Sequence, residues 1–361
     1  MYILYYALIG VLGVYSYALV DPNFTLINHP LWELFRNNTV ILGYYNRQYS
    51  WYIYVTLVIL LFIAQYLFMR TWKKHSPIRI SIIVGLLLLM AYPLLSHDFF
   101  NYLFDAKIVT YYHASPYMFR ALDFPNDPWV RFMHWTHRTY PYGPSFLFVT
   151  LIPSFFGGGK LILNYLFFKI VFALCYVGSV WALSKVHRKY ALFFATSPLV
   201  LVEGLVNAHN DMVALFFAFL GISFLWNKKQ YASRIMFVLS LFTKYISFPV
   251  LFVTKNKSVW TFGSFVIVHL LLIYVGIRQE IQAWYFLNLL IFMPWYYKYI
   301  RSLSILYVGL LLSYYPYIRL DAWNGPSVFI KHNIILVTVC LTVVYLFYEN
   351  RKYLSTSFFK R

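Results

Sequence analysis

The sequence predicts an all-α protein that crosses a membrane many times. Of its 361 residues, 61% are hydrophobic and only 11% are charged, whereas a soluble domain usually carries about 25% charged residues. The apolar residues gather in repeated runs, many of them roughly 17–23 residues long, which is the length that crosses a bilayer. Tyr and Trp flank many of these runs, as they do at the two surfaces of a membrane.

The apolar runs set the order of the expected elements. No segment longer than a loop separates them, so residues 1–361 are predicted to form a single integral membrane domain. We expect about ten transmembrane helices together with re-entrant or broken helices. The runs fall at about 1–20, 51–69, 77–95, 144–156, 161–184, 190–203, 211–226, 231–254, 258–277, 283–297, 302–318 and 330–348.

Two of these runs are not typical of transmembrane helices. The run at 144–156 is short and contains Pro153, and the run at 231–254 is interrupted by Lys244 and Pro249. Irregular backbone survives at membrane depth only where it lines a cavity inside the protein. We therefore predict that both runs are re-entrant or broken helices. The alternative is that both cross and that the positive-inside rule fails locally.

The net charge of +19 does not indicate nucleic-acid binding in this chain. Lys and Arg cluster in short loops, the first strong cluster being Arg70, Lys73, Lys74 and Arg79, and such clusters mark cytoplasmic loops and attract anionic lipid headgroups. This pattern predicts cytoplasmic N- and C-termini and places residues 96–143 on the extracytoplasmic face. All of the 11 acidic residues except Glu349 then fall on or near that face.

Asp98 is the first candidate for chemistry. A carboxylate directly after a long apolar run is costly to keep near lipid, so a function is the first explanation to test. The run at 77–95 is expected to be a helix that ends just before Asp98. On a helix, the spacing of Asp98, Tyr102 and Asp105 puts all three on one face, with His97 beside them. Such a group could act as a general base or bind a divalent cation. The alternative is a solvated first turn.

Three further groups of polar residues stand out. His137 and Arg138, in the predicted outer loop, could bind a phosphate or could anchor the loop at the interface. Glu203 precedes Asn207, His209 and Asp211 in a short turn between two apolar runs, where they could serve a site, ligate a metal or cap the following helix. Lys244, inside an apolar run, needs a partner, either an anionic ligand or an acidic residue elsewhere in the chain.

The motif that begins at Asp98 resembles the outer-loop motif of the polytopic GT-C glycosyltransferases. In this chain it reads Asp98-Phe-Phe-Asn-Tyr102-Leu-Phe-Asp-Ala106, followed by Ser115-Pro-Tyr117, with Ser115 in place of an Asn. Tyr140-Pro-Tyr-Gly-Pro144 is similar to the aromatic-proline entry to the next helix of that family.

Two later motifs extend the resemblance. Asn207-Ala-His-Asn-Asp211 is similar to an Asn-Gly-His-Asn-Asp motif, with Ala208 in place of Gly, and Lys244…Pro249 resembles a Lys-x-x-Pro segment with two more residues in its spacing. The resemblance covers residues 77–254, which would be a catalytic module containing the outer loop 96–143. Residues 258–361 would supply C-terminal transmembrane helices.

The resemblance implies a GT-C-like bundle that transfers mannose or another hexose from a polyprenyl-phosphate donor to a hydroxyl of a glycan, lipid or protein acceptor. Transfer would occur on the extracytoplasmic face with inversion. Asp98 would be the general base, assisted or oriented by His97, Tyr102 and Asp105. The donor's phosphate and sugar would be bound by His137, Arg138, Asn207, His209, Asp211 and Lys244.

No cofactor is required in this scheme. A divalent cation, Mg or Mn, between Asp98, Asp105 and Asp211 is left open. So are two other functions, a flippase or transporter of lipid-linked sugars and a polymerase or ligase of lipid-linked glycans.

Overall fold

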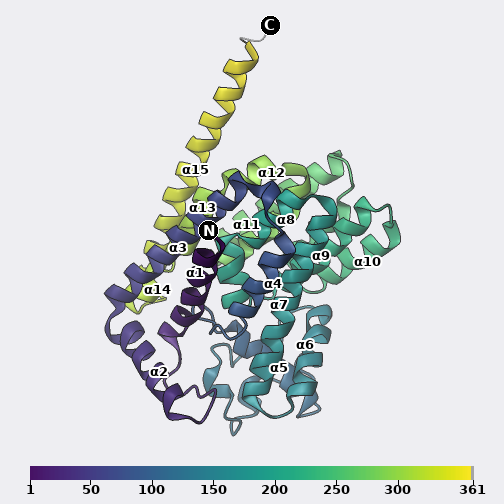
Figure 1. The fold of residues 1–361 in the computed structure, drawn as a ribbon. Coiled ribbons are helices and arrows are strands. Elements are labelled where there is room, and N and C mark those ends of the chain that lie inside the picture. The colour runs from purple at the N-terminus through teal and green to yellow at the C-terminus, as the bar shows by residue number, and fades with distance from the viewer. Residues whose placement is uncertain (359–361) are drawn as a thin grey trace.

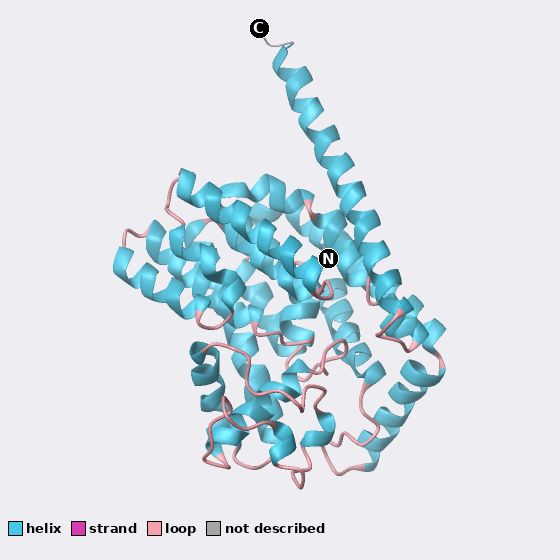
Figure 2. Ribbon diagram, turned by 180° about the vertical axis from the view of Figure 1, so that it is seen from behind, coloured by secondary structure: helices cyan, strands magenta, loops and turns pink. Residues whose placement is uncertain are grey.

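A computed structural model describes the fold of residues 1–358 and the side chains of residues 1–349. Within that part of the chain all regular structure is helical and there are no strands (Figure 2). Together with several long apolar helices, this confirms an all-α polytopic membrane protein.

The helical elements follow the apolar runs along the chain. In the first half they are α1 (Tyr2–Tyr15), η1 (Ser16–Leu19), α2 (Pro30–Val40), η2 (Ile41–Tyr45), α3 (Arg47–Arg70), η3 (Trp72–Lys74), α4 (Pro77–Leu87), α5 (Asp98–Thr110), η4 (Ala121–Asp123), η5 (Val130–Phe132), α6 (Pro144–Gly157) and α7 (Leu161–Val186). In the second half they are α8 (Arg188–Ala195), η6 (Val200–Val206), α9 (Asp211–Trp226), α10 (Gln230–Leu241), η7 (Tyr245–Phe252), α11 (Val259–Arg278), η8 (Ala283–Phe292), α12 (Met293–Ser302), α13 (Ser304–Leu312), α14 (Tyr315–Leu320) and α15 (Pro326–Phe358).

Five helical segments of the described chain are long and apolar enough to cross a membrane. They are Tyr2–Leu19, Arg47–Arg70, Leu161–Val186, Val259–Arg278 and Pro326–Glu349. The number rises to 7 if two bent pairs of helices each make one span. The expected ten or so crossings would require the shorter apolar helices α4, α6 and α9 to cross as well, so that number stays a prediction.

Helix α7 lies inside the bundle and packs against α4, α6, α8 and α9. By contrast, only 22% of the apolar window of α11, and the same share of α15, is buried in the protein, which leaves the rest for lipid. In Figure 1 the end of α15 projects beyond the body, and α2, α5 and α6 lie at the opposite end of the molecule. Much of the loop structure also lies at that end (Figure 2).

The segment between α4 and α5 is irregular, although a helix was expected up to residue 95. Helix α4 ends at Leu87, and Pro93, which lacks an N–H, stands in the turns that follow. The freed backbone groups are bonded by side chains from other elements: Tyr165 donates to the Ala91 carbonyl, and the Leu95 N–H donates to Asn207. Buried irregular backbone is stable only when its groups are paired in this way.

The two runs with expected interruptions differ in the structure. The run at 231–254 is broken as predicted, because α10 ends at Leu241 and η7 begins only at Tyr245, with Lys244 in an extended conformation between them. The run at 144–156 forms one continuous helix, α6, so the expected break is wrong there. Pro153 lies inside α6, where it removes one backbone hydrogen bond, the one that its N–H would have donated to the carbonyl four residues earlier. Re-entry of α6 stays a prediction.

Two bends were missed from the sequence. Helices α8 and η6 meet at 67°, and the segment of η8 and α12 meets that of α13 and α14 at 73°. Pro198 lies in the first gap and accounts for that bend. The first bend also sets the path of the chain into the polar turn after η6.

Candidate active site

A cavity of about 580 Å³ lies at the N-terminus of α5. The residues around it come from three parts of the chain: the start of α5, the loop before α6, and the segment from α11 to α15. They are Leu95, Ser96, His97, Asp98, His134, Trp135, Arg138, Gln279, Glu280, Gln282, Trp284, Tyr285, Tyr317 and Trp323. The cavity thus combines carboxylates, imidazoles and a guanidinium group with an aromatic wall.

Asp98 is the first residue of α5, and a hydrogen bond holds one of its carboxylate oxygens. The indole Nε1–H of Trp135 donates to its Oδ1 at 3.0 Å. Its Oδ2 lies 3.7 Å from Nδ1 of His209. The carboxylate is therefore fixed in direction while its residue lines the cavity.

The environment of Asp98 makes it more basic than an exposed aspartate. Burial raises the pKa of the carboxyl, and the positive charges of Lys244 and Arg138 offset part of that rise. The hydrogen bond from Trp135 acts in the same direction as those charges. A carboxylate whose pKa moves toward neutrality is a better proton acceptor at neutral pH.

Asp105 lies on α5 as predicted. A general base must be deprotonated, however, and Asp105 is not. Burial raises its pKa to about 8, with Arg138 lowering it and Asp98 raising it. At neutral pH the carboxyl is therefore mostly protonated. Asp98 remains the better base of the two.

His97 stacks on His134, with ring centroids 3.9 Å apart and planes 10° apart. Burial and the neighbouring His134 lower the pKa of His97 to about 4, so its ring is neutral at pH 7. The Nδ1 atom of His97 lies 3.2 Å from the carbonyl oxygen of Phe132. The pair of rings forms one wall of the cavity.

Arg138 provides an unpaired cation at the cavity. Among residues 1–349 its guanidinium has no ion pair and no hydrogen bond, and it lies over the ring of Trp135, 4.8 Å from the centroid. Its charge remains available to an anion. His137 is exposed and does not line the cavity; its ring contacts Trp135 from outside.

The turn after η6 carries His209 behind the cavity. Ala208 has a φ of +55°, a left-handed conformation that glycine adopts without strain, and this explains why related motifs have Gly at this position. His209 stacks on Trp284 with ring centroids 3.9 Å apart. Its Nε2 lies 3.5 Å from a carboxylate oxygen of Glu203, so the ring lies between Glu203 and Asp98. Neither ring nitrogen has a hydrogen-bond partner among the described residues.

Lys244 finds its partners inside the protein. Its Nζ donates to Oδ2 of Asp211 at 2.8 Å and to Oδ1 of Asn210 at 2.9 Å. Asn288 donates to the other oxygen of Asp211 at 2.8 Å. Of the two partners expected for Lys244, the structure shows the acidic residue.

Asn207 and Tyr102 are also fully buried. Asn207 accepts from the Leu95 N–H at 3.0 Å and donates to Glu203 at 3.0 Å, so it fixes the segment that leads into Asp98. The hydroxyl of Tyr102 accepts from the Asn210 N–H at 3.4 Å. Neither residue lines the cavity; each bonds the backbone of a segment that shapes the site.

The carboxylates Asp98, Asp105 and Asp211 were considered as ligands of a divalent cation. Within the described residues no group of three or more His, Cys, Asp or Glu side chains is arranged to hold a metal ion. Asp211 already accepts from Lys244 and Asn288.

Several residues of the site carried no motif in the sequence. Glu280, which lines the cavity, pairs with the buried Lys331 at 2.7 Å. Lys169 on α7 donates to the carbonyls of Leu205 and Val206, at 2.9 and 2.7 Å, and supports the end of η6. A lysine inside an apolar run is costly without a partner, and this signal could have identified both lysines.

Residues 7–256 match a protein-family model described as alpha-(1->6)-mannopyranosyltransferase, N-terminal domain. The chain belongs to this mannosyltransferase family. No curated protein and no solved structure matches it.

Membership of a GT-C-type mannosyltransferase family confirms the resemblance found in the motifs and shows that the protein is a glycosyltransferase. The protein is therefore an enzyme, and the family does not support the alternative of a flippase or transporter. The match contains Asp98, Arg138, the turn at 207–211 and Lys244. The wall from Gln279 to Trp323 lies beyond it, and the boundaries at 77 and 254 stay predictions.

Proposed function

We propose that the protein transfers mannose from a polyprenyl-phosphate donor to an acceptor hydroxyl, in the cavity in front of Asp98. The observation that carries the proposal is that Asp98, with a raised pKa, and the unpaired Arg138 line one cavity. A proton acceptor and a phosphate-binding cation are the two groups that this transfer requires.

In the proposed step, the acceptor hydroxyl attacks the anomeric carbon and gives its proton to Asp98. The new carbon–oxygen bond forms as the bond from the anomeric carbon to the phosphate oxygen breaks. The electron pair leaves with the polyprenyl phosphate, whose added negative charge faces Arg138. A single displacement inverts the anomeric centre.

The other predicted residues take supporting roles. Trp135 orients the carboxylate of Asp98 through a hydrogen bond to one oxygen, and His209 lies near the other oxygen. Lys244, Asp211 and Asn207 position the turn and the segment around the site. Asp105, protonated at neutral pH, and Tyr102 lie behind Asp98 on α5, and His137 would contact only the outer part of a large donor.

The cavity is proposed to face the extracytoplasmic side. Support comes from the distribution of charge, since the Lys and Arg clusters lie in loops of the other side. A glycan, lipid or protein hydroxyl would then accept the sugar, and the lipid of the donor would lie among the apolar helices.

The donor is tested by incubating purified protein with polyprenyl-phosphate mannose, polyprenyl-phosphate glucose and GDP-mannose in separate reactions. We expect release of polyprenyl phosphate from the first and a product of opposite anomeric configuration. Transfer from GDP-mannose alone would refute the proposed donor. Full activity in excess EDTA is expected, because no divalent cation takes part in the proposed step.

A further inference from the structure

A second cavity, of about 530 Å³, lies at the other end of α3 from the candidate active site. Near the start of α3, Arg47 donates to the carbonyl of Tyr317, a residue that lines the first cavity. At its end, Arg70 lines the second. The 24 residues of this helix span about 36 Å at 1.5 Å per residue. The two cavities therefore lie toward opposite ends of a helix that is long enough to cross a membrane.

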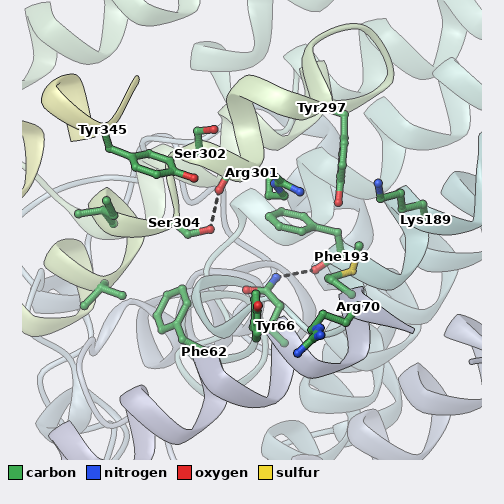
Figure 3. A pocket seen from close by; sticks show the side chains of 14 residues that line it. Phe62, Tyr66, Arg70, Lys189, Phe193, Tyr297, Arg301, Ser302, Ser304 and Tyr345 are labelled. Atoms are coloured by element: carbon green, nitrogen blue, oxygen red, sulfur yellow. Dashed lines mark hydrogen bonds between the residues drawn. The ribbon is translucent and has the colours of Figure 1, made fainter. Parts of the chain in front are cut away.

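The second cavity combines cations with aromatic rings (Figure 3). Its cations are Arg70 from α3, Lys189 from α8 and Arg301 from α12. The rest of its wall is mainly aromatic and aliphatic and includes Phe62, Tyr66, Phe193, Tyr297, Val308 and Tyr345. One side of the cavity is thus positively charged and another is apolar.

Two of the three cations have no acidic partner. Among residues 1–349, Arg70 and Lys189 make no ion pair and no side-chain hydrogen bond; each lies against a ring, Arg70 over Tyr66 and Lys189 over Tyr297 at 4.8 Å. Arg301 pairs with Glu349 at 3.5 Å. Residues 350–361 contain no Asp or Glu. The cavity therefore carries excess positive charge.

A polar group without a partner also lies at this cavity. The hydroxyl of Tyr297 is buried and has no hydrogen-bond partner among the described residues. Figure 3 shows it beside Lys189, in the wall of the cavity. A buried hydroxyl is normally hydrogen-bonded, so a bound acceptor would complete this wall.

We propose that this cavity binds the phosphate-bearing headgroup of an anionic membrane lipid. Arg70 and Lys189 would face the phosphate, Tyr297 would donate to one of its oxygens, and Phe62 and Val308 would contact the acyl chains. Basic pockets between transmembrane helices bind anionic headgroups in this way. Lys73, Lys74 and Arg188 lie nearby in sequence, and they would draw the same lipids to this side of the membrane.

The proposal is tested with the full chain in a neutral detergent. Phosphatidylglycerol, phosphatidylcholine and inorganic phosphate are titrated separately, and binding is followed by native mass spectrometry and by the shift in melting temperature. We expect saturable binding of phosphatidylglycerol at a single high-affinity site, with little effect of phosphatidylcholine. Inorganic phosphate should compete only weakly, because it lacks the acyl chains.

The double variant Arg70→Gln/Lys189→Gln should weaken phosphatidylglycerol binding by about tenfold or more, since each basic side chain adds substantially to the attraction. The matched control, Lys73→Gln/Lys74→Gln, removes the same charge from residues that do not line the cavity. In a neutral detergent there is no charged membrane surface for these lysines to act on, so binding should change by less than about twofold. Tyr297→Phe, which deletes only the hydroxyl, should weaken binding severalfold and tests the site if the double variant does not fold.

If the wild type and both lining variants bind phosphatidylglycerol equally, this cavity is not the binding site. Phosphate binding as tight as that of phosphatidylglycerol would overturn the lipid as its occupant. Because neither Arg70 nor Lys189 lines the other cavity, these results are separable from a failure of the proposed transfer reaction.

Discussion

The indole of Trp135 and the carboxylate of Asp98 form a 3.0 Å hydrogen bond between a loop and the first residue of α5. This bond orients one oxygen of Asp98 and lowers its pKa, against the larger effect of burial. A residue that is 37 positions away in the sequence thus tunes the proposed base.

Trp135→Phe keeps an aromatic ring beneath Arg138 and removes the N–H donor. Without that bond the pKa of Asp98 rises, so the acidic limb of the kcat/KM profile should move to higher pH. We expect kcat to fall about tenfold from the loss of orientation. The measurement is the pH profile of mannosyl transfer. An unchanged acidic limb would show that Trp135 does not act through Asp98.

Lys244→Met should destabilise the protein, because it leaves the buried carboxylate of Asp211 without its cation. Breaking one partner of a buried pair costs about 3–5 kcal/mol. The double variant Lys244→Met/Asp211→Asn, which removes both charges, should recover much of the melting temperature. A large rise in donor KM with unchanged melting temperature would instead mean that Lys244 contacts the donor directly.

Asp105→Asn should stabilise the protein increasingly as the pH rises from 4 to 8. The pKa of Asp105 is raised from 3.8 in the unfolded chain to about 8 in the fold. The folded state therefore retains a proton that the unfolded state loses, and the wild type loses stability over this window. Melting temperatures of both proteins at several pH values test the expectation. A constant difference between them would show that Asp105 is ionised throughout.

The orientation in the membrane is tested in a Cys340→Ser background, because the thiol of Cys340 is exposed. Tyr117→Cys, in the exposed part of the loop at 96–143, should react with a membrane-impermeant maleimide in intact cells. Lys73→Cys, also exposed, should react only after permeabilisation. The reverse pattern would place the candidate active site in the cytoplasm.

The sequence was most informative where the physical signal is local. Apolar runs identified the long helices, and Lys244 and Pro249 correctly predicted the break between α10 and η7. The helix expected up to residue 95 failed because the irregular segment is stabilised by Asn207 and Tyr165, from distant parts of the chain. Such pairing leaves no pattern within the segment itself.

In the candidate site, too, some residues could be identified from the sequence and others only from the structure. Asp98 and Arg138 were identified by residue type and position, and they line one cavity. The walls from Trp284 and Glu280 could not be predicted, because the segment at 279–285 carries no motif and approaches the start of α5 only in the folded chain. Lys244 could be recognised as needing a partner, but the choice between a ligand and Asp211 required the structure.

Asp98 is the proposed general base, and the variant Asp98→Asn isolates that role. The variant keeps the size of the side chain and removes its ability to accept the proton. The matched control is Asp123→Asn, which changes a carboxylate of the same outer loop that pairs with Arg120 away from the cavity.

The measurement is the single-turnover rate of mannosyl transfer by purified, folded protein at saturating donor. We expect Asp98→Asn to lower this rate by about 10³-fold, as loss of a general base does, with donor affinity and melting temperature close to those of the wild type. Asp123→Asn should stay within about twofold, since an exposed ion pair contributes little. A rate for Asp98→Asn near that of the wild type would show that Asp98 is not the general base.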